Sequence, residues 1–232
     1  PVRKDAVPMI TPRMILRDVG EGFVYLKRWK GMLYLAFIAA ILNFLLTPSS
    51  TLMPLMVTQH FKGGVWQLSL LESVMGIGIV VGGVTLGVWG GFKNRIYTSL
   101  IGVAGLGLGI LVFGLAPARM FWMGVAGFAF VGFMNPIANG PLHAILQSKI
   151  APEMQGRVLG LINSLCMMMM PIALLIAAPV AELVGLQVWY WVGGLLVILV
   201  ALWALLVPSI TSLDRTAPSI QAAAATAESP LV

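Results

Sequence analysis

Between residues 188 and 207 the chain reads VWYWVGGLLVILVALWALLV, which is twenty consecutive residues without a charged side chain. An α-helix needs about 20 apolar residues to cross the ~30 Å hydrocarbon core of a bilayer. Outer-membrane strands, by contrast, are alternating segments of about ten residues. Five more continuous apolar segments approach or exceed the helical length, at residues 33–57, 65–90, 96–115, 121–145 and 158–183. The sequence therefore predicts an all-α membrane protein with six transmembrane helices.

The composition of the whole chain agrees with this class. Of the 232 residues, 59% are hydrophobic and 9% are charged, and the mean hydropathy is +0.96. A soluble domain averages about 25% charged residues and could not bury so much apolar surface in one core. The composition thus excludes a soluble globular domain, a disordered chain and a disulfide-stabilised scaffold. Six spans leave no room for a separate soluble domain.

Basic residues predict the orientation in the membrane. Of the 14 Lys and Arg residues, only Lys62 and Arg119 lie on the side opposite to the two chain ends. Cytoplasmic loops of membrane proteins are enriched in Lys and Arg. We therefore expect an integral protein of the cytoplasmic (inner) membrane with both termini in the cytoplasm. We interpret the net charge of +6 as a result of this topology and expect no nucleic acid partner.

The two ends of the chain predict different structures around a transmembrane bundle at residues 31–208. In residues 1–30, Thr11 and Pro12 are suited to begin a short amphipathic helix, which is interpreted as a cytoplasmic linker from an upstream domain or as a juxtamembrane anchor. This stretch has no apolar segment of the kind found in a signal peptide. Residues 209–232 are rich in Ala, Ser, Thr and Pro and are expected to form a disordered cytoplasmic tail.

Glu72 is the sharpest candidate for function, because polar side chains inside a span cost free energy in lipid. It lies in the second span, roughly 9 Å below the outer end at about 1.5 Å per residue. A carboxyl group at this depth is suited to load and release a proton, or to bind a cationic substrate. The alternative is that the span begins later and Glu72 reaches the outer water.

A second group of polar residues centres on the fourth span, where Pro136 and Pro141 follow closely after asparagines. A proline removes a backbone donor, so we expect this helix to be kinked or partly unwound, which is tolerated beside a cavity. The alternatives are hydrogen bonds from each Asn to a neighbouring helix, and contact of the histidine with interfacial water. The candidates for a substrate path are Asn43, Asn135, Asn139, His143 and Asn163, and His143 is also a candidate gate or proton relay.

Glycines at four-residue spacing predict close packing between helices, because they let a neighbouring backbone approach. The pairs or series are Gly78 with Gly82, Gly83 with Gly87 and Gly91, and Gly105 with Gly109.

No cofactor or metal site is predicted. The single cysteine, Cys166, is followed by four methionines, a run that would suit a soft metal. Only Cys166, Met169 and Met170 share a helix face, however, and methionine commonly fills irregular apolar space. The sequence also lacks a nucleophile elbow, a phosphate loop and a paired metal-ligand motif. We therefore expect no enzyme activity, no cofactor and no bound metal.

Two loops resemble motifs of the major facilitator superfamily. Residues 87–95 read GVWGGFKNR, which is similar to its repeated loop, although Gly91 stands where the family has Asp and Asn94 where it has Gly. Residues 151–160 read APEMQGRVLG and resemble its proline-acid-x-x-glycine-arginine loop. Residues 18–26 read DVGEGFVYL and are similar to the middle loop of the macrolide-efflux and siderophore-export branch.

The resemblance implies a cytoplasmic gate formed by these two loops. Because Gly91 replaces the acidic residue, a latch based on a carboxylate is not expected in the first loop. Arg157 would close the gate by binding the carboxyl ends of helices, where the helix dipole is negative. The loop and gate candidates are Gly87, Gly91, Lys93, Arg95, Glu153, Gly156 and Arg157.

In register, the chain resembles the carboxyl-terminal half of a twelve-span facilitator. The resemblance implies one half-bundle built from 3+3 inverted repeats, which works by alternating access together with an amino-terminal half. The first, second, fourth and fifth spans would face the cavity and the partner half. The start at Pro rather than Met agrees with a missing amino-terminal half.

These observations lead to one functional interpretation and two alternatives. The chain is interpreted as half of a secondary active transporter, a proton-coupled antiporter or multidrug permease that exports amphipathic small molecules or drugs. Its expected partners are membrane lipid, a small-molecule substrate and an amino-terminal six-helix half in the same full-length chain. The alternatives are a half-size carrier that works as a homodimer and a membrane scaffold that does not transport.

Overall fold

The computed structural model describes residues 30–150 and 152–211. Within these ranges the chain is helical and contains no β-strand. Six helical segments are long and apolar enough to cross a membrane, which confirms the all-α class and the number of spans. The helices are α2 (Lys30–Thr51), α3 (Met53–Leu55), the π-helix η1 (Met56–His60), α4 (Val65–Trp89), α5 (Arg95–Leu115), α6 (Phe121–Lys149), α7 (Pro152–Val184), α8 (Leu186–Leu206) and α9 (Pro208–Thr211).

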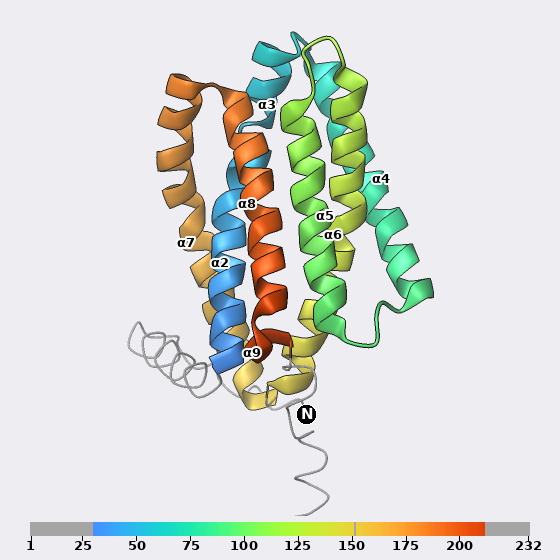
Figure 1. The fold of residues 1–232 in the computed structure, drawn as a ribbon, viewed down its shortest axis with the longest axis vertical. Helices are drawn as coiled ribbons and strands as arrows, with labels where there is room; N and C mark the ends of the chain where they lie inside the picture. Colours follow the sequence, from blue (N-terminus) through green and yellow to red (C-terminus); the bar gives the residue numbers. More distant parts are fainter. Residues whose placement is uncertain (1–29, 151, 212–232) are drawn as a thin grey trace, which may run out of the picture.

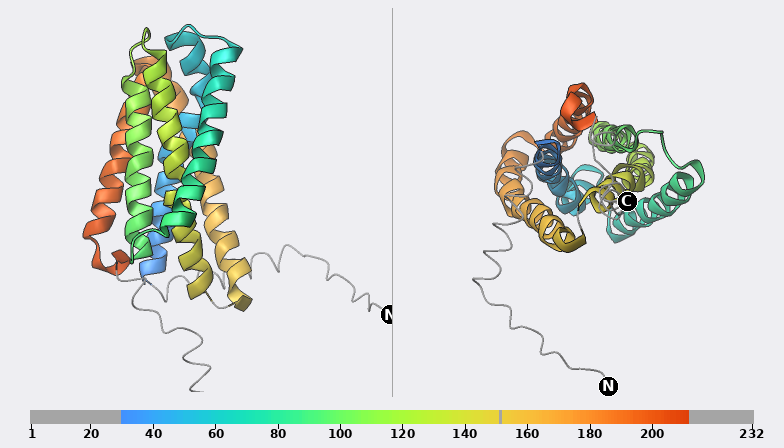
Figure 2. Two further views of the ribbon diagram at one scale, coloured as in Figure 1. Left: turned by 90° about the vertical axis from the view of Figure 1, so that its right-hand side faces the viewer. Right: turned by 90° about the horizontal axis from the view of Figure 1, so that it is seen from below.

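The spans stand side by side and run alternately up and down (Figures 1 and 2). We call the end of the bundle that holds Lys30 and α9 the tail end, and the end that holds η1 and the α5–α6 loop the far end. The predicted amphipathic helix lies outside the described residues, as does the predicted tail apart from the last three residues of α9. Within α9, Ile210 is fully buried at the tail end of the bundle.

Helix contacts repeat between the first three and the last three spans. α4 packs on α6 in the same way that α7 packs on the first helix, α2. Likewise α5 packs on α6 as α8 packs on α2, and α5 and α8 pack on each other. Exchanging the two sets of three spans therefore pairs the first four of these contacts and leaves the α5–α8 contact unchanged, as expected for the 3+3 inverted repeats of a half-bundle.

Glycines build the contacts of α6, because their backbones touch it directly. Side chains at Gly78 and Gly82 of α4 would collide with the backbone of α6 around Phe133. Gly105 and Gly109 of α5 are likewise closed off by side-chain and backbone atoms of α6. Both four-residue pairs thus serve close packing as predicted. Two glycines of the remaining series behave differently, since no described atom lies within 4 Å of a Cβ placed on Gly83 or Gly87.

The irregular span is the first one and not the fourth. α6 continues through Pro136 and Pro141 without a break in its helical structure, so the fourth span is not unwound there, and the expected kink stays a prediction. The first span instead is interrupted at Leu52, continues through the short α3 and becomes the π-helix η1 from Met56 onward. Pro54 contributes to this change, because a proline cannot donate the hydrogen bond that continues an α-helix.

Candidate functional site

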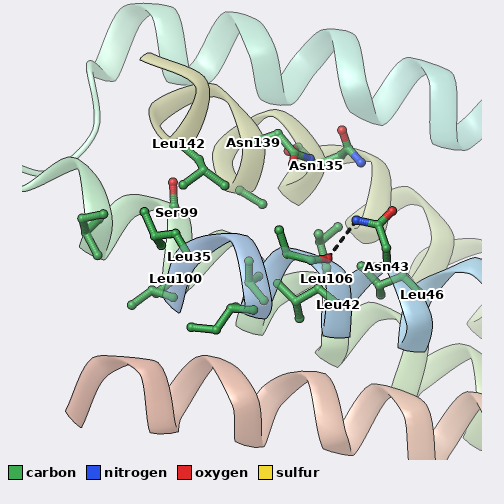
Figure 3. A pocket seen from close by; sticks show the side chains of 15 residues that line it. Leu35, Leu42, Asn43, Leu46, Ser99, Leu100, Leu106, Asn135, Asn139 and Leu142 are labelled. Carbon is green, nitrogen blue, oxygen red and sulfur yellow. Dashed lines mark hydrogen bonds between the residues drawn. The ribbon is translucent and has the colours of Figure 1, made fainter. Parts of the chain in front are cut away.

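A cavity of about 250 Å³ lies near the middle of the bundle between α2, α5 and α6 (Figure 3). Its walls are mostly leucine, isoleucine, valine and alanine side chains. Three asparagines interrupt this apolar lining, Asn43 from α2 and Asn135 and Asn139 from α6. The two α6 residues are one helical turn apart, so both face the same space.

Two further chambers adjoin this cavity and share its asparagines. The first, of about 180 Å³, is lined by Asn43 and Asn139 and by His143, Asn163 and Cys166. The second, of about 250 Å³, lies toward the far end and is lined by Asn43, Asn135 and residues that include Ser49. Asn43 borders all three spaces. The structure thus brings together five of the six polar residues that the sequence singles out within the spans.

Two of the cavity asparagines use their amide nitrogens for hydrogen bonds within their own helices. Asn43 donates its Nδ2 to the carbonyl of Ala39 over 2.9 Å, and Asn139 donates its Nδ2 to the carbonyl of Asn135 over 3.1 Å (the former dashed in Figure 3). Both acceptors belong to the donor's own helix, not to a neighbouring one. The amide oxygens are therefore left as acceptors on an otherwise apolar wall, a composition typical of small-molecule sites.

Glu72 lies apart from this group. It occupies the eighth position of α4, and its side chain is exposed and lines none of the three chambers. The face of α4 that is buried against the bundle carries Leu71, Gly78 and Gly82. Glu72 follows Leu71 in the sequence and therefore lies about 100° further around the helix axis. Among the described residues it has no hydrogen bond or ion pair.

The α4–α5 loop explains why glycine replaces the acidic residue of the family motif. Gly90 and Gly91 both adopt positive φ, 76° and 77°, a region that favours glycine. A side chain at Gly91 would also press against Thr98, whose Oγ1 accepts a hydrogen bond from the Phe92 amide over 2.8 Å. The other predicted loop residues, Gly87, Lys93 and Arg95, are exposed at the tail end.

The α6–α7 connection also lies at the tail end. Gly156 is exposed, the side chain of Glu153 lies outside the described part of the chain, and Arg157 is half-buried with its Nη1 4.0 Å from Met154 Sδ. Gln155 donates its Nε2 to the carbonyls of Gln147, over 2.7 Å, and Ile150. A glutamine that the sequence does not single out therefore binds the carboxyl end of α6. The gate role of Arg157 stays a prediction.

Two residues that join elements were not found from sequence. At the far end, His60 Nε2 lies 2.9 Å from the Ala116 carbonyl oxygen and 3.0 Å from Gln187 Nε2, which links η1 to α8 and to the α5–α6 loop. Asn94 accepts a hydrogen bond from the Ile96 amide and donates one to the Thr211 carbonyl over 3.0 Å. A single histidine or asparagine near a span end gives no pattern from which such distant partners follow.

No group of three or more metal-binding side chains is found in the described ranges. Cys166 lines the 180 Å³ chamber, whereas Met167, Met168 and Met170 are exposed on the outside of α7. The run of sulfur-containing residues therefore does not converge on one point.

Comparison with known proteins identifies the family. The model of the Major Facilitator Superfamily matches residues 2–168. The chain belongs to the major facilitator superfamily. This facilitator chain is 30% identical to the macrolide efflux protein A of Streptococcus pyogenes over 210 residues, which cover 90% of the chain and 52% of that relative. It is 31% identical to the Enterococcus faecalis macrolide efflux protein A over 170 residues, or 73% and 52% of the two proteins.

A more distant relative is the multidrug efflux pump Tap of Mycolicibacterium fortuitum, 28% identical over 150 residues, which cover 64% of the chain and 36% of the pump. No solved structure matches the facilitator chain. The predicted superfamily and its macrolide-efflux branch are confirmed. The chain spans about half the length of its macrolide-efflux relatives, with 52% of each covered.

Proposed function

We propose that the chain is one half of a secondary active transporter that exports amphipathic small molecules by alternating access. The observation that carries the proposal is that two adjoining chambers with mostly apolar walls are lined by the polar residues Asn43, Asn135, Asn139, His143 and Asn163. Polar groups at this depth in a lipid-embedded bundle mark a substrate path, because they are costly elsewhere. The names of the relatives, macrolide and multidrug efflux proteins, agree with an exporter.

The cavity favours a ligand that donates hydrogen bonds. The amide oxygens of Asn43 and Asn139 are acceptors, and no charged residue lines the central cavity. A large apolar molecule that carries hydroxyl groups satisfies both conditions, whereas a multiply charged ion does not. Macrolides, which the relatives' names specify, belong to this class.

The second half of the transporter is proposed to cover α4 and α7. These are the least buried of the six spans, and Glu72 is exposed on α4. An exposed carboxylate about 10 Å along a membrane-spanning helix is costly in lipid, so a protein partner or an aqueous path is required beside it. We assign this place to the amino-terminal half of a full-length chain in the inner membrane, with both chain ends cytoplasmic and with Glu72 carrying the coupled proton.

Transport in proteoliposomes tests the cavity. With the full-length protein and erythromycin as the probe, Asn43→Leu is expected to reduce transport at least tenfold, because it removes a polar group common to all three chambers. Gln59→Leu serves as the control, since Gln59 is an exposed amide that lines none of them. Equal transport by the Asn43 variant and the wild type would overturn the proposed site.

The coupling role of Glu72 requires a separate measurement. Glu72→Gln is expected to abolish acceleration of erythromycin efflux by a pH gradient while exchange of labelled for unlabelled erythromycin continues. Undiminished acceleration would remove Glu72 from coupling. The chain expressed alone is expected not to transport, and transport by it alone would favour the homodimeric carrier instead.

A further inference from the structure

Two buried hydroxyls in the described bundle have no hydrogen-bond partner, those of Ser49 and Ser99, and of these only Ser99 lines the central cavity. Ser99, the fifth residue of α5, is only 5% exposed, and its Oγ makes no hydrogen bond. Leaving a buried polar atom unpaired costs about 1–3 kcal/mol, so such an atom needs an explanation.

Several other hydroxyls in the helices form a hydrogen bond with a backbone carbonyl of their own helix. Ser73, Thr85 and Ser148 donate to the carbonyls three or four residues earlier, over 2.7, 2.8 and 3.0 Å. Such a bond is available to most serines in a helix. The Ser99 hydroxyl does not make it, and the group is therefore free to bind another molecule.

Ser99 lies in one arm of the central cavity. By this arm we mean the part of the cavity that is lined by Leu35 and Ile38 of α2 and by Ser99 and Leu100 of α5. In Figure 3 Ser99 lies toward Leu35 and Leu142, at the other end of the lining from Asn43 and Leu46. The single cavity thus has asparagines at one place and an isolated hydroxyl at another, with apolar walls between them.

The chemistry of this arm limits what enters it. A serine hydroxyl can donate one hydrogen bond and can also accept hydrogen bonds. No charged side chain lines the cavity. A neutral hydroxyl, ether or carbonyl group on an apolar scaffold would pair with Ser99 and fill the space around it. An ionised group would lose its hydration there without a counter-charge.

We propose that Ser99 anchors a neutral hydrogen-bonding group of the transported ligand in the arm between α2 and α5. This assignment rests on the proposed function, since it requires that the central cavity receives the ligand. It adds a contact from α5, the third span, to those from α2, α6 and α7. The ligand would then span the cavity, with one polar region at the asparagines and a neutral group at Ser99.

Equilibrium binding to the full-length protein in detergent tests the proposal, with erythromycin as the probe. Ser99→Ala is expected to raise the Kd about three- to tenfold, which is the effect of one lost neutral hydrogen bond. The stability of the ligand-free protein should not fall, because the removed hydroxyl has no partner. Ser148→Ala is the matched control, since the Ser148 hydroxyl is paired with its own helix and lines none of the three chambers.

A second variant reports whether the ligand reaches this arm. In a Cys166→Ala background with any other cysteines removed, Ser99→Cys is expected to react with N-ethylmaleimide more slowly when erythromycin is bound. An unchanged Kd for Ser99→Ala together with no protection of the Ser99→Cys thiol would overturn the proposal and leave Ser99 as a water site. If Asn43→Leu still weakens binding in that case, only the role of Ser99 fails. If the wild type does not bind the probe, the proposed function fails as well.

Discussion

At the scale of single residues, a few hydrogen bonds between distant helices hold the irregular first span. The last carbonyl groups of an α-helix have no partner within the helix. Ser49 lies in the last turn of α2, and its carbonyl accepts a hydrogen bond from the Tyr190 hydroxyl of α8 over 2.8 Å. Tyr190 is fully buried, so water does not replace this bond. One hydroxyl therefore stabilises the point at which the first span leaves α-helical geometry.

Tyr190→Phe is expected to lower the free energy of unfolding by about 0.5–2 kcal/mol, since it leaves the Ser49 carbonyl buried and unpaired. Denaturant titration of the protein in detergent micelles measures the change. Tyr34→Phe is the control, because Tyr34 is 42% exposed on the same helix as Ser49 and should lose little. Equal stability of the Tyr190 variant and the wild type would show that the bond does not hold the break.

At the scale of elements, the length and number of the spans could be predicted because they follow from apolar composition. The position of the break could not. Both the first and fourth spans contain two prolines, yet only the first departs from the α-helix. The difference depends on donors supplied by distant helices, such as the Tyr190 hydroxyl, and no local pattern encodes them.

Some residues of the candidate site could likewise be predicted from the sequence, and others could not. The asparagines and His143 could be found because a polar group in a span is costly and therefore informative. Ser99 gave no such signal, since a helical serine usually binds its own backbone. The direction of Glu72 depends on the rotation of α4, which is set by close contacts of Gly78 and Gly82 with α6. That rotation is a property of packing and not of the sequence around Glu72.

The tail end offers a prediction about how one element is attached. Asn94 caps α5 through its side-chain oxygen and holds α9 through its side-chain nitrogen. Asn94→Ala removes both functions and is expected to cost about 1–2 kcal/mol in stability. Asn94→Ser keeps a capping oxygen but is too short to reach Thr211, so its loss should be smaller.

Hydrogen exchange separates the two functions. Both variants should increase exchange of the Ile210 amide in α9, whereas only Asn94→Ala should increase exchange at Ile96 in the first turn of α5. If the Ile210 amide stayed protected from exchange in both variants, burial of the Ile210 side chain alone would be what attaches α9 to the bundle.

At the scale of the whole molecule, charge and packing lead to one arrangement in the membrane. Lys93 and Arg95 lie at the tail end, and Lys62 and Arg119 lie at the far end. The structure does not describe segments 1–29 and 212–232. When their basic residues are added, most of the positive charge of the sequence lies on the side of the two chain ends. Since positive charge is retained in the cytoplasm, the far end is expected to face outward.

Cysteine labelling in cells checks this orientation. In a full-length protein without other cysteines, Arg119→Cys should react with a membrane-impermeant maleimide in intact cells. Lys93→Cys should react at least tenfold more slowly until the inner membrane is permeabilised. The two positions form a matched pair, because both are exposed basic residues in loops between spans. Rapid labelling of Lys93→Cys in intact cells would show the opposite orientation, with the α4–α5 loop and the proposed gate on the outside of the membrane.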